Sequence, residues 1–230
     1  LVRGGVTERM YRALAGWLRP LPGGLLHTNI LASTVFASIS GSSVATAATI
    51  GTVAFPTFRA QNYSERWVAG TVASGATLGI LIPPSINLII YGAITNTSIG
   101  ALFVAGILPG LLLAALFMGI IVVWSVLDPA IAGPRGAMAP WAERRQRLVD
   151  LLPPLAIFMV VMGSIYGGWA TPTEAAAVGV LAALLLVGAS GRLRGAMLRE
   201  AALATVTTTA MTLLILVAAF YLNFVLGVLG

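Results

Sequence analysis

Long apolar segments separated by short polar stretches dominate the chain, and this pattern predicts helices that cross a lipid bilayer. A membrane-spanning helix needs about 20 mainly apolar residues. The apolar runs are continuous and much longer than the roughly ten-residue alternating segments of a membrane β-barrel. We therefore expect an all-α polytopic membrane protein whose apolar segments cover residues 25–56, 68–95, 99–127, 151–169, 174–190 and 201–229.

Segment 25–56 has small polar residues at its centre, where an ordinary spanning helix would be apolar. The run Gly41-Ser42-Ser43 is flanked on both sides by apolar residues. Hydrocarbon offers no hydrogen-bond partners, so irregular backbone persists at that depth only inside protein or beside a watery cavity. The pattern predicts an interruption of the helix at this run, close to mid-membrane.

A second interruption lies in segment 68–95, at Pro83-Pro84. Proline lacks the N–H that a helical hydrogen bond needs, and it pushes the preceding residue, Ile82, out of helical geometry. Carbonyls before the break, around Thr77–Leu81, then lose their partners. A simple proline kink is the alternative to a true break. Two interrupted membrane segments close in sequence are typical of the binding site of a secondary transporter.

Composition supports the membrane assignment and excludes several kinds of site. The chain is 58% apolar and only 9% charged, whereas a soluble domain has about 25% charged residues. It contains no cysteine, no lysine and one histidine, His27. Cysteine or histidine metal clusters and a Walker-type phosphate loop are therefore excluded from this stretch. His27 is expected to be a packing residue rather than a proton carrier. Because the chain begins at Leu1 and ends inside an apolar run, we expect an internal fragment of a longer protein.

The arginines predict the topology. All thirteen basic residues are arginines, and they lie in four stretches, 1–20, 57–67, 128–150 and 191–200. Cytoplasmic loops are enriched in basic residues, so we expect all four stretches in the cytoplasm. Segment 25–56 would then begin and end on the same side.

A re-entrant helical hairpin satisfies this topology. Segment 25–56 has 32 residues, too few for two full spans and a turn at 1.5 Å per residue. The alternative is one ordinary span over 30–56 with a small-residue packing face, which would place stretches 1–20 and 57–67 on opposite sides. The expected organisation is a cytoplasmic interfacial helix in 1–24, the hairpin in 25–56, a broken span and a following span in 57–127, a cytoplasmic loop in 128–150, and further spans in 151–230.

The two interruptions supply the candidate binding residues. Freed carbonyls and hydroxyls suit a small hard cation such as Na⁺, and helix N-termini suit a carboxylate. A purely structural turn with locally bonded serines is the alternative. The expected Na⁺ ligands are Gly41, Ser42, Ser43, Thr77 and Gly79, and the expected substrate cavity is lined by Pro83, Pro84, Ser85 and Asn87.

A third motif, Thr171-Pro172-Thr173-Glu174, resembles the start of a helix. Thr171 would be the N-cap, Pro172 the first helical residue, and Glu174 the partner in a capping box. The functional alternative is that Thr171, Thr173 and Glu174 line an outward cavity and gate access to it.

Four sequence strings together resemble one transporter family. They are GSSVATAATIG (41–51), ASGATLGILIPPS (73–85), YGAITNTSIGALFVAGILPGLLLA (91–114) and YGGWATPTEAAAVG (166–179). They are similar to the large membrane subunit of tripartite ATP-independent periplasmic (TRAP) transporters, over about residues 20–220. The resemblance implies the ion-transporter-superfamily elevator fold, with two inverted repeats and two re-entrant hairpins, of which this chain would hold the first hairpin and the start of the second repeat.

The resemblance also implies a function. Such a subunit lies in the bacterial inner membrane and imports a carboxylate, such as a C4-dicarboxylate or sialic acid, using a Na⁺ gradient. Its partners would be a small four-helix membrane subunit and a periplasmic substrate-binding protein. No cofactor and no nucleic acid are expected, and Na⁺ is the coupling ion. By this similarity Gly41, Ser42 and Ser43 match the first hairpin tip, and residues 77–85 match the broken helix beside it.

Other functions remain open from the residues alone. The membrane subunit of an ATP-driven importer and a proton-coupled carrier are the main alternatives. A passive channel would need polar rings through several spans, whereas the polar residues concentrate at two breaks. An enzyme is not expected, because no metal-ligand spacing, nucleophile–base pair or buried acid pair is present in the sequence.

Overall fold

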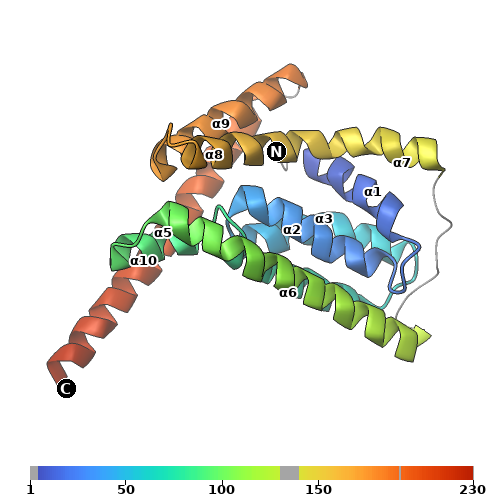
Figure 1. Ribbon diagram of the computed structural model, residues 1–230, viewed down its shortest axis with the longest axis horizontal. Coiled ribbons are helices and arrows are strands. Elements are labelled where there is room, and N and C mark those ends of the chain that lie inside the picture. Colours follow the sequence, from blue (N-terminus) through green and yellow to red (C-terminus); the bar gives the residue numbers. More distant parts are fainter. Residues whose placement is uncertain (1–4, 130–139, 192, 230) are drawn as a thin grey trace. The chain divides into compact units, whose positions relative to one another are not determined.

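Helices form the regular structure throughout the described part of the chain. The computed structural model describes residues 5–129, 140–191 and 193–229. Three of the arginines counted above, Arg3, Arg135 and Arg192, lie outside these residues, as do residues 130–139 of the loop expected over 128–150. The helices, shown in Figure 1, are α1 (Val6–Leu18), α2 (Leu25–Ser40), α3 (Ser43–Arg59), α4 (Glu65–Leu81), α5 (Ile86–Thr95), α6 (Ile99–Leu127), α7 (Trp141–Arg147), the 3₁₀ helix η3 (Leu148–Leu151), α8 (Leu152–Tyr166), α9 (Pro172–Ala189) and α10 (Gly195–Leu229).

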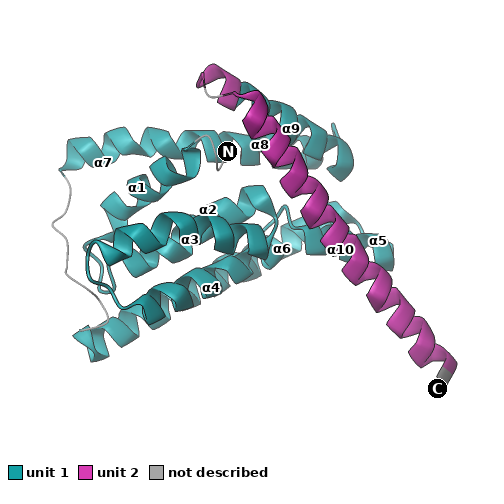
Figure 2. Cartoon of the chain, turned by 180° about the vertical axis from the view of Figure 1, so that it is seen from behind, with its two compact units in different colours: residues 1–186 teal, residues 187–230 magenta. Residues whose placement is uncertain are grey.

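The chain divides into two compact units, Leu1–Leu186 and Val187–Gly230, which are coloured separately in Figure 2. The first unit holds the two interruptions. The second unit consists of the end of α9 and the long helix α10, whose apolar side chains are largely exposed. An exposed apolar helix of this length is typical of a membrane span in contact with lipid or with other helices.

Five helical segments in the described part of the chain are long and apolar enough to cross a membrane. Helix α2 is also apolar but has only 16 residues. The prediction of an all-α polytopic membrane protein is confirmed. The candidate spans among the described residues are Glu65–Thr95, Ile99–Leu127, Trp141–Tyr166, Pro172–Ala189 and Gly195–Val228.

Helices α2 and α3 are separated by a two-residue turn. Gly41 has φ 60° and ψ 13°, the left-handed conformation that glycine adopts without a steric penalty. Ser42 is extended, and its Oγ accepts a hydrogen bond from the N–H of Ala45 at 3.3 Å. This is the bond of an N-cap serine. Residues 30–56 are therefore not one continuous helix.

Helix α4 lies along both helices and shows that the chain reverses at the turn. Along α2, Asn29 bonds Thr71 and Ser33 faces Gly75, so α2 and α4 run in parallel. Along α3 the order is opposite, because its first turn meets Gly79 and Gly51 lies near Val72. Helices α2 and α3 thus run in opposite directions and form a helical hairpin.

A buried chain of hydrogen bonds joins α1, α2 and α4. The Tyr11 hydroxyl donates to Asn29 Oδ1 at 2.6 Å, and Asn29 Nδ2 donates to Thr71 Oγ1 at 2.9 Å. All three side chains are buried. Burial raises the pKa of the Tyr11 phenol, so it stays protonated and remains a donor. Because unpaired polar groups are costly when buried, this chain fixes α1 against the hairpin.

The helix limits differ most from the expected ones in two places. The region expected as a polar loop over 128–150 contains α7 and η3, and α10 begins at Gly195, six residues before the expected segment 201–229. Helix α7 has no apolar stripe, so hydropathy does not reveal it. An ion pair between Arg147 and Glu143, four residues apart, and an edge-on contact between Trp17 and Trp141 at 5.4 Å support it instead.

Candidate functional site

The second interruption is a complete break between helices. Helix α4 ends at Leu81 and α5 begins at Ile86, with a cis peptide bond between Pro83 and Pro84. Ile82 has φ −75° and ψ 124°, the extended conformation expected before proline. The structure therefore holds two separate helices here rather than one kinked helix.

The hairpin turn and the break lie against each other. The N–H of Ile86 donates to the carbonyl oxygen of Gly41 at 3.2 Å. A Cβ at Gly41 would lie 2.5 Å from the carbonyl oxygen of Pro84, and a Cβ at Gly79 would lie 2.9 Å from the Ser42 carbonyl group. Only residues without a side chain allow the backbones to approach this closely.

Four helix ends meet at this point. The C-terminal ends of α2 and α4 bring backbone carbonyls, and the N-terminal ends of α3 and α5 bring backbone N–H groups. Helix C-termini carry partial negative charge and helix N-termini partial positive charge. The junction, which we define as residues 40–46 and 79–86, can therefore accommodate both a cation and an anion.

Hydroxyl groups add oxygen atoms to the junction. Thr46 Oγ1 donates to the Ser42 carbonyl oxygen at 2.7 Å and lies 3.1 Å from Ser40 Oγ. Ser85 Oγ donates to the carbonyl oxygen of Ile80. Thr46 and Ser85 are fully buried. Ser40 and Thr46 were not predicted as site residues, although Thr46 follows Ser42 by four residues and so shares its side of α3.

Two of the predicted residues are not brought into the junction. Thr77 is exposed, and its Oγ1 donates to the Ser74 carbonyl oxygen of its own helix at 2.6 Å. It lies about 200° around the helix from Gly79, because successive residues are separated by about 100°. Asn87 is exposed on the first turn of α5. The other predicted ion-site and cavity residues lie within the junction, namely Gly41, Ser42, Ser43, Gly79, Pro83, Pro84 and Ser85.

The motif at the start of α9 forms a complete capping box. The N–H of Thr171 donates to Glu174 Oε2 at 2.8 Å, and the N–H of Glu174 donates to Thr171 Oγ1 at 3.3 Å. The Thr171 hydroxyl also donates to Glu174 Oε2 at 2.8 Å. Thr171, Thr173 and Glu174 are exposed. These bonds account for the motif as a helix start, and the gating role stays a prediction.

A cavity of about 380 Å³ connects the junction with α9. Ser40, Pro84 and Pro172 line it together with apolar side chains such as Phe36 and Phe103. Among the described residues there is no group of three or more His, Cys, Asp or Glu that could hold a metal ion. A cation at the junction would therefore be bound by carbonyl and hydroxyl oxygens, which suit hard ions.

Comparison with known proteins identifies the family. The family model described as "Tripartite ATP-independent periplasmic transporter, DctM component" matches residues 1–230. The C4-dicarboxylate TRAP transporter large permease protein DctM of Pseudomonas aeruginosa is 40% identical over 179 residues, which is 77% of this chain and 41% of that protein.

Two further relatives are named for other substrates. The sialic acid TRAP transporter large permease protein SiaM of Vibrio cholerae is 39% identical over 79% of this chain and 42% of its own length. The ectoine/5-hydroxyectoine large permease protein UehC of Ruegeria pomeroyi is 37% identical over 81% and 43%. This chain thus spans less than half the length of these relatives, which are permease subunits rather than enzymes. The family model matches the whole of this chain, and the three relatives are 37% to 40% identical to it. The chain therefore belongs to the DctM component family of tripartite ATP-independent periplasmic transporters.

Proposed function

We propose that this chain is part of a large permease subunit that imports an organic acid across the bacterial inner membrane, driven by a Na⁺ gradient. Two of the relatives are named for C4-dicarboxylates and sialic acid, which are organic acids. The proposed partners are a small four-helix membrane subunit, which supports the large one, and a periplasmic binding protein, which delivers the substrate. We propose no cofactor.

The contact between Gly41 and Ile86 is the observation that carries the proposal. It joins the hairpin turn to the break, so that carbonyl ends and N–H ends of helices share one place. In transporters with broken helices, carbonyl ends bind the coupling cation and N-terminal ends face an anionic substrate. The Na⁺ ligands proposed within the junction are the backbone and hydroxyl oxygens of Gly41, Ser42 and Ser43.

Binding of the cation and binding of the carboxylate would be coupled, because both ligands share the junction. A bound cation offsets the negative charge of a carboxylate nearby, and the carboxylate does the same for the cation. Each ligand therefore increases the affinity for the other. Pro84 lines the cavity of about 380 Å³. We propose that Pro83, Ser85 and Asn87 complete the wall of the substrate site, and that Glu174 gates access to it.

Uptake of a labelled organic acid into proteoliposomes tests this proposal. The full-length parent protein would be reconstituted with its small subunit and binding protein, under an inward Na⁺ gradient or an equal K⁺ gradient. We expect uptake only with Na⁺. Ser43→Ala should raise the Na⁺ concentration for half-maximal uptake about fivefold, the effect of losing roughly 1 kcal/mol from one polar contact.

The variant is chosen so that folding is preserved. Ser43 makes no side-chain bond among those found in the described residues, whereas Ser42 caps α3 and its replacement would disturb the helix. Thr207→Ala is the matched control, because it removes an exposed hydroxyl from α10 that bonds only its own helix. Uptake that ignores Na⁺ and follows ATP or pH alone would replace the mechanism with an ATP-driven or proton-coupled one.

A further inference from the structure

A second cavity, separate from the junction, lies between α1, the beginning of α2, the end of α3 and α7. It measures about 450 Å³. Three arginines and one glutamate line it, which gives its wall an excess of positive charge, and the hydroxyl of Thr57 and the amide of Gln61 add polar groups. The charged residues are Arg12, Arg19, Arg147 and Glu143.

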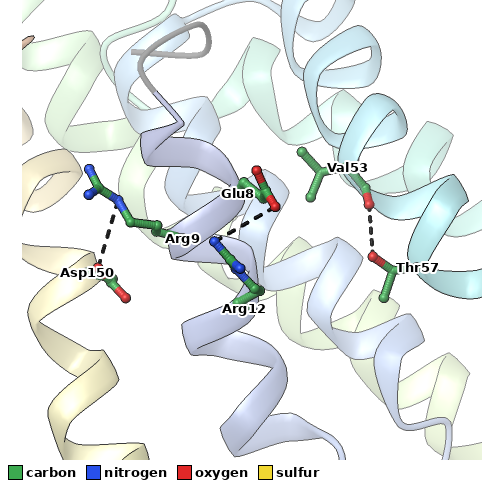
Figure 3. A network of polar contacts seen from close by, with 6 residues as sticks. All are labelled: Glu8, Arg9, Arg12, Val53, Thr57 and Asp150. Atoms are coloured by element: carbon green, nitrogen blue, oxygen red, sulfur yellow. Dashed lines mark hydrogen bonds and ion pairs between the residues drawn. The ribbon is translucent and has the colours of Figure 1, made fainter. Parts of the chain in front are cut away.

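An adjoining cavity extends this space along α1. It measures about 370 Å³ and shares Arg12, Ala15 and Thr57 with the first one. Figure 3 shows this side of α1, with Arg12 beside Glu8 and Thr57 on the neighbouring helix. The two cavities together form one elongated recess, which we call the arginine recess. Its second part is lined by Glu8, by several threonines and by the apolar residues Ala15, Val53 and Pro56.

The arginines in the recess are incompletely neutralised. Arg19 Nη2 donates to Gln61 Oε1 at 2.7 Å, but its buried Nε has no hydrogen-bond partner among the described residues. Arg12 pairs with Glu8 at 3.7 Å, a distance of weak attraction between exposed side chains. Of these three arginines, Arg147 has the closest carboxylate among the described residues, that of Glu143. A buried N–H without a partner costs free energy, which an oxygen-rich anion would offset.

Aromatic side chains beside the recess indicate its depth in the membrane. The guanidinium of Arg144 lies 4.1 Å from the ring centre of Trp17 and 5.3 Å from that of Trp141. The indole N–H of Trp17 is buried without a partner in the described part of the chain. Tryptophan is enriched at the level of lipid headgroups, and arginine on the cytoplasmic side.

We propose that the arginine recess binds the phosphate headgroup of an anionic phospholipid from the cytoplasmic leaflet. Arginine matches phosphate oxygens with paired N–H donors. Basic pockets between membrane helices on the cytoplasmic side bind such headgroups. Along α1 and α3, the space beside Ala15, Val53 and Pro56 can hold the first carbons of an acyl chain. The lipid would hold α1 and α7 together at the membrane surface, next to the ion pair between Arg9 and Asp150 at 3.9 Å.

Lipid binding to the purified full-length complex tests this site. Native mass spectrometry would count bound phosphatidylglycerol against phosphatidylcholine for the wild type and for the variant Arg19→Gln/Arg147→Gln. We expect selective binding of phosphatidylglycerol to the wild type, weakened about tenfold to thirtyfold in the variant, since each arginine near the surface contributes roughly 1 kcal/mol. Arg66→Gln is the matched control, because Arg66 is exposed on α4 outside the recess.

Each other result overturns the proposal in a distinct way. Equal protection of the complex against heat by inorganic phosphate and by phosphatidylglycerol would make the recess a site for soluble anions. If Arg66→Gln loses as much bound phosphatidylglycerol as the double variant, the lipid is attracted by net charge alone. If the double variant keeps all of its bound phosphatidylglycerol, the lipid binds elsewhere. If the double variant does not fold, Arg19→Lys serves instead. It keeps the charge but not the paired donors, and should reduce phosphatidylglycerol binding without changing phosphatidylcholine binding.

Discussion

At the scale of single residues, Gly41 carries the most demanding conformation of the junction. Its φ of 60° is unfavourable for residues with a side chain, and its missing Cβ leaves room for the Pro84 carbonyl oxygen. Both requirements exclude a Cβ atom at residue 41. No other amino acid satisfies the turn and the contact together.

Gly41→Ala is therefore expected to separate the hairpin turn from the break. The left-handed conformation costs an L-residue roughly 1–2 kcal/mol, and the clash with Pro84 adds to this. Substrate uptake by the full-length complex should fall by at least about tenfold, as 1.4 kcal/mol corresponds to that factor. Gly119→Ala is the control, since a Cβ there meets nothing within 4 Å in the described residues. Normal uptake by Gly41→Ala would show that the close contact is dispensable.

Residue types in the sequence were sufficient to locate Gly41 and the proline pair, but not to say what each one contacts. Glycine and serine inside an apolar run predict a turn, but they do not indicate which residues the turn packs against. The contact of Gly79 with Ser42, and the exposure of Thr77 two residues earlier, depend on the rotation of α4 about its axis. That rotation is set by tertiary packing, which a single sequence does not display.

At the scale of helices, a seam of small residues holds α2 and α4 together. Thr71, Gly75 and Gly79 recur every four residues on α4 and lie against Asn29, Ser33 and the hairpin turn. Membrane helices associate through such small-residue faces, since lipid provides little hydrophobic drive for their contact. The seam makes the hairpin and the broken helix one packed element.

A pair of substitutions tests the seam. A Cβ at Gly75 would lie 2.6 Å from Ser33 Oγ and 2.9 Å from Ser33 Cβ, so Gly75→Ala should destabilise the protein by about 1–3 kcal/mol through overpacking. Ser33→Gly removes both atoms, and the double variant should regain part of the lost stability. Thermal unfolding of the purified full-length complex measures this. Gly163→Ala, with open space around its Cβ, should match the wild type. Additive losses in the double variant would contradict the contact.

Helix prediction from the sequence succeeded where hydropathy carried the signal. The apolar runs predicted the spans, and the pattern Thr-Pro-Thr-Glu predicted a start for α9 that the capping bonds of Thr171 and Glu174 confirm. Helix α7 was missed because its polar residues resemble a loop. Its contact with Trp17 is between residues far apart in sequence, and local patterns contain no trace of it.

At the scale of the whole molecule, the positions of the arginines predict which loops lie in the cytoplasm. Labelling of single cysteines in cells tests this prediction, because this chain has no native cysteine. With any other cysteine of the full-length parent replaced, Glu8→Cys and Ser64→Cys should react with a membrane-impermeant maleimide only after the cytoplasmic side is opened. Thr97→Cys and Trp169→Cys should react from outside. All four side chains are exposed. Reaction of Glu8→Cys and Ser64→Cys from opposite sides would mean that the hairpin does not re-enter.

The hydrogen bonds at the two ends of the seam also limit how the molecule can move. Asn29 and Thr71 are bonded at one end, and Gly41 and Ile86 at the other. Sliding α2 along α4 by one residue, with α5 kept in place, would break both bonds at once, and a membrane interior offers no water to replace them. These bonds therefore oppose shear between α2 and α4. We expect a conformational change during the proposed transport to carry α2 and the broken helix together, with its hinges outside them.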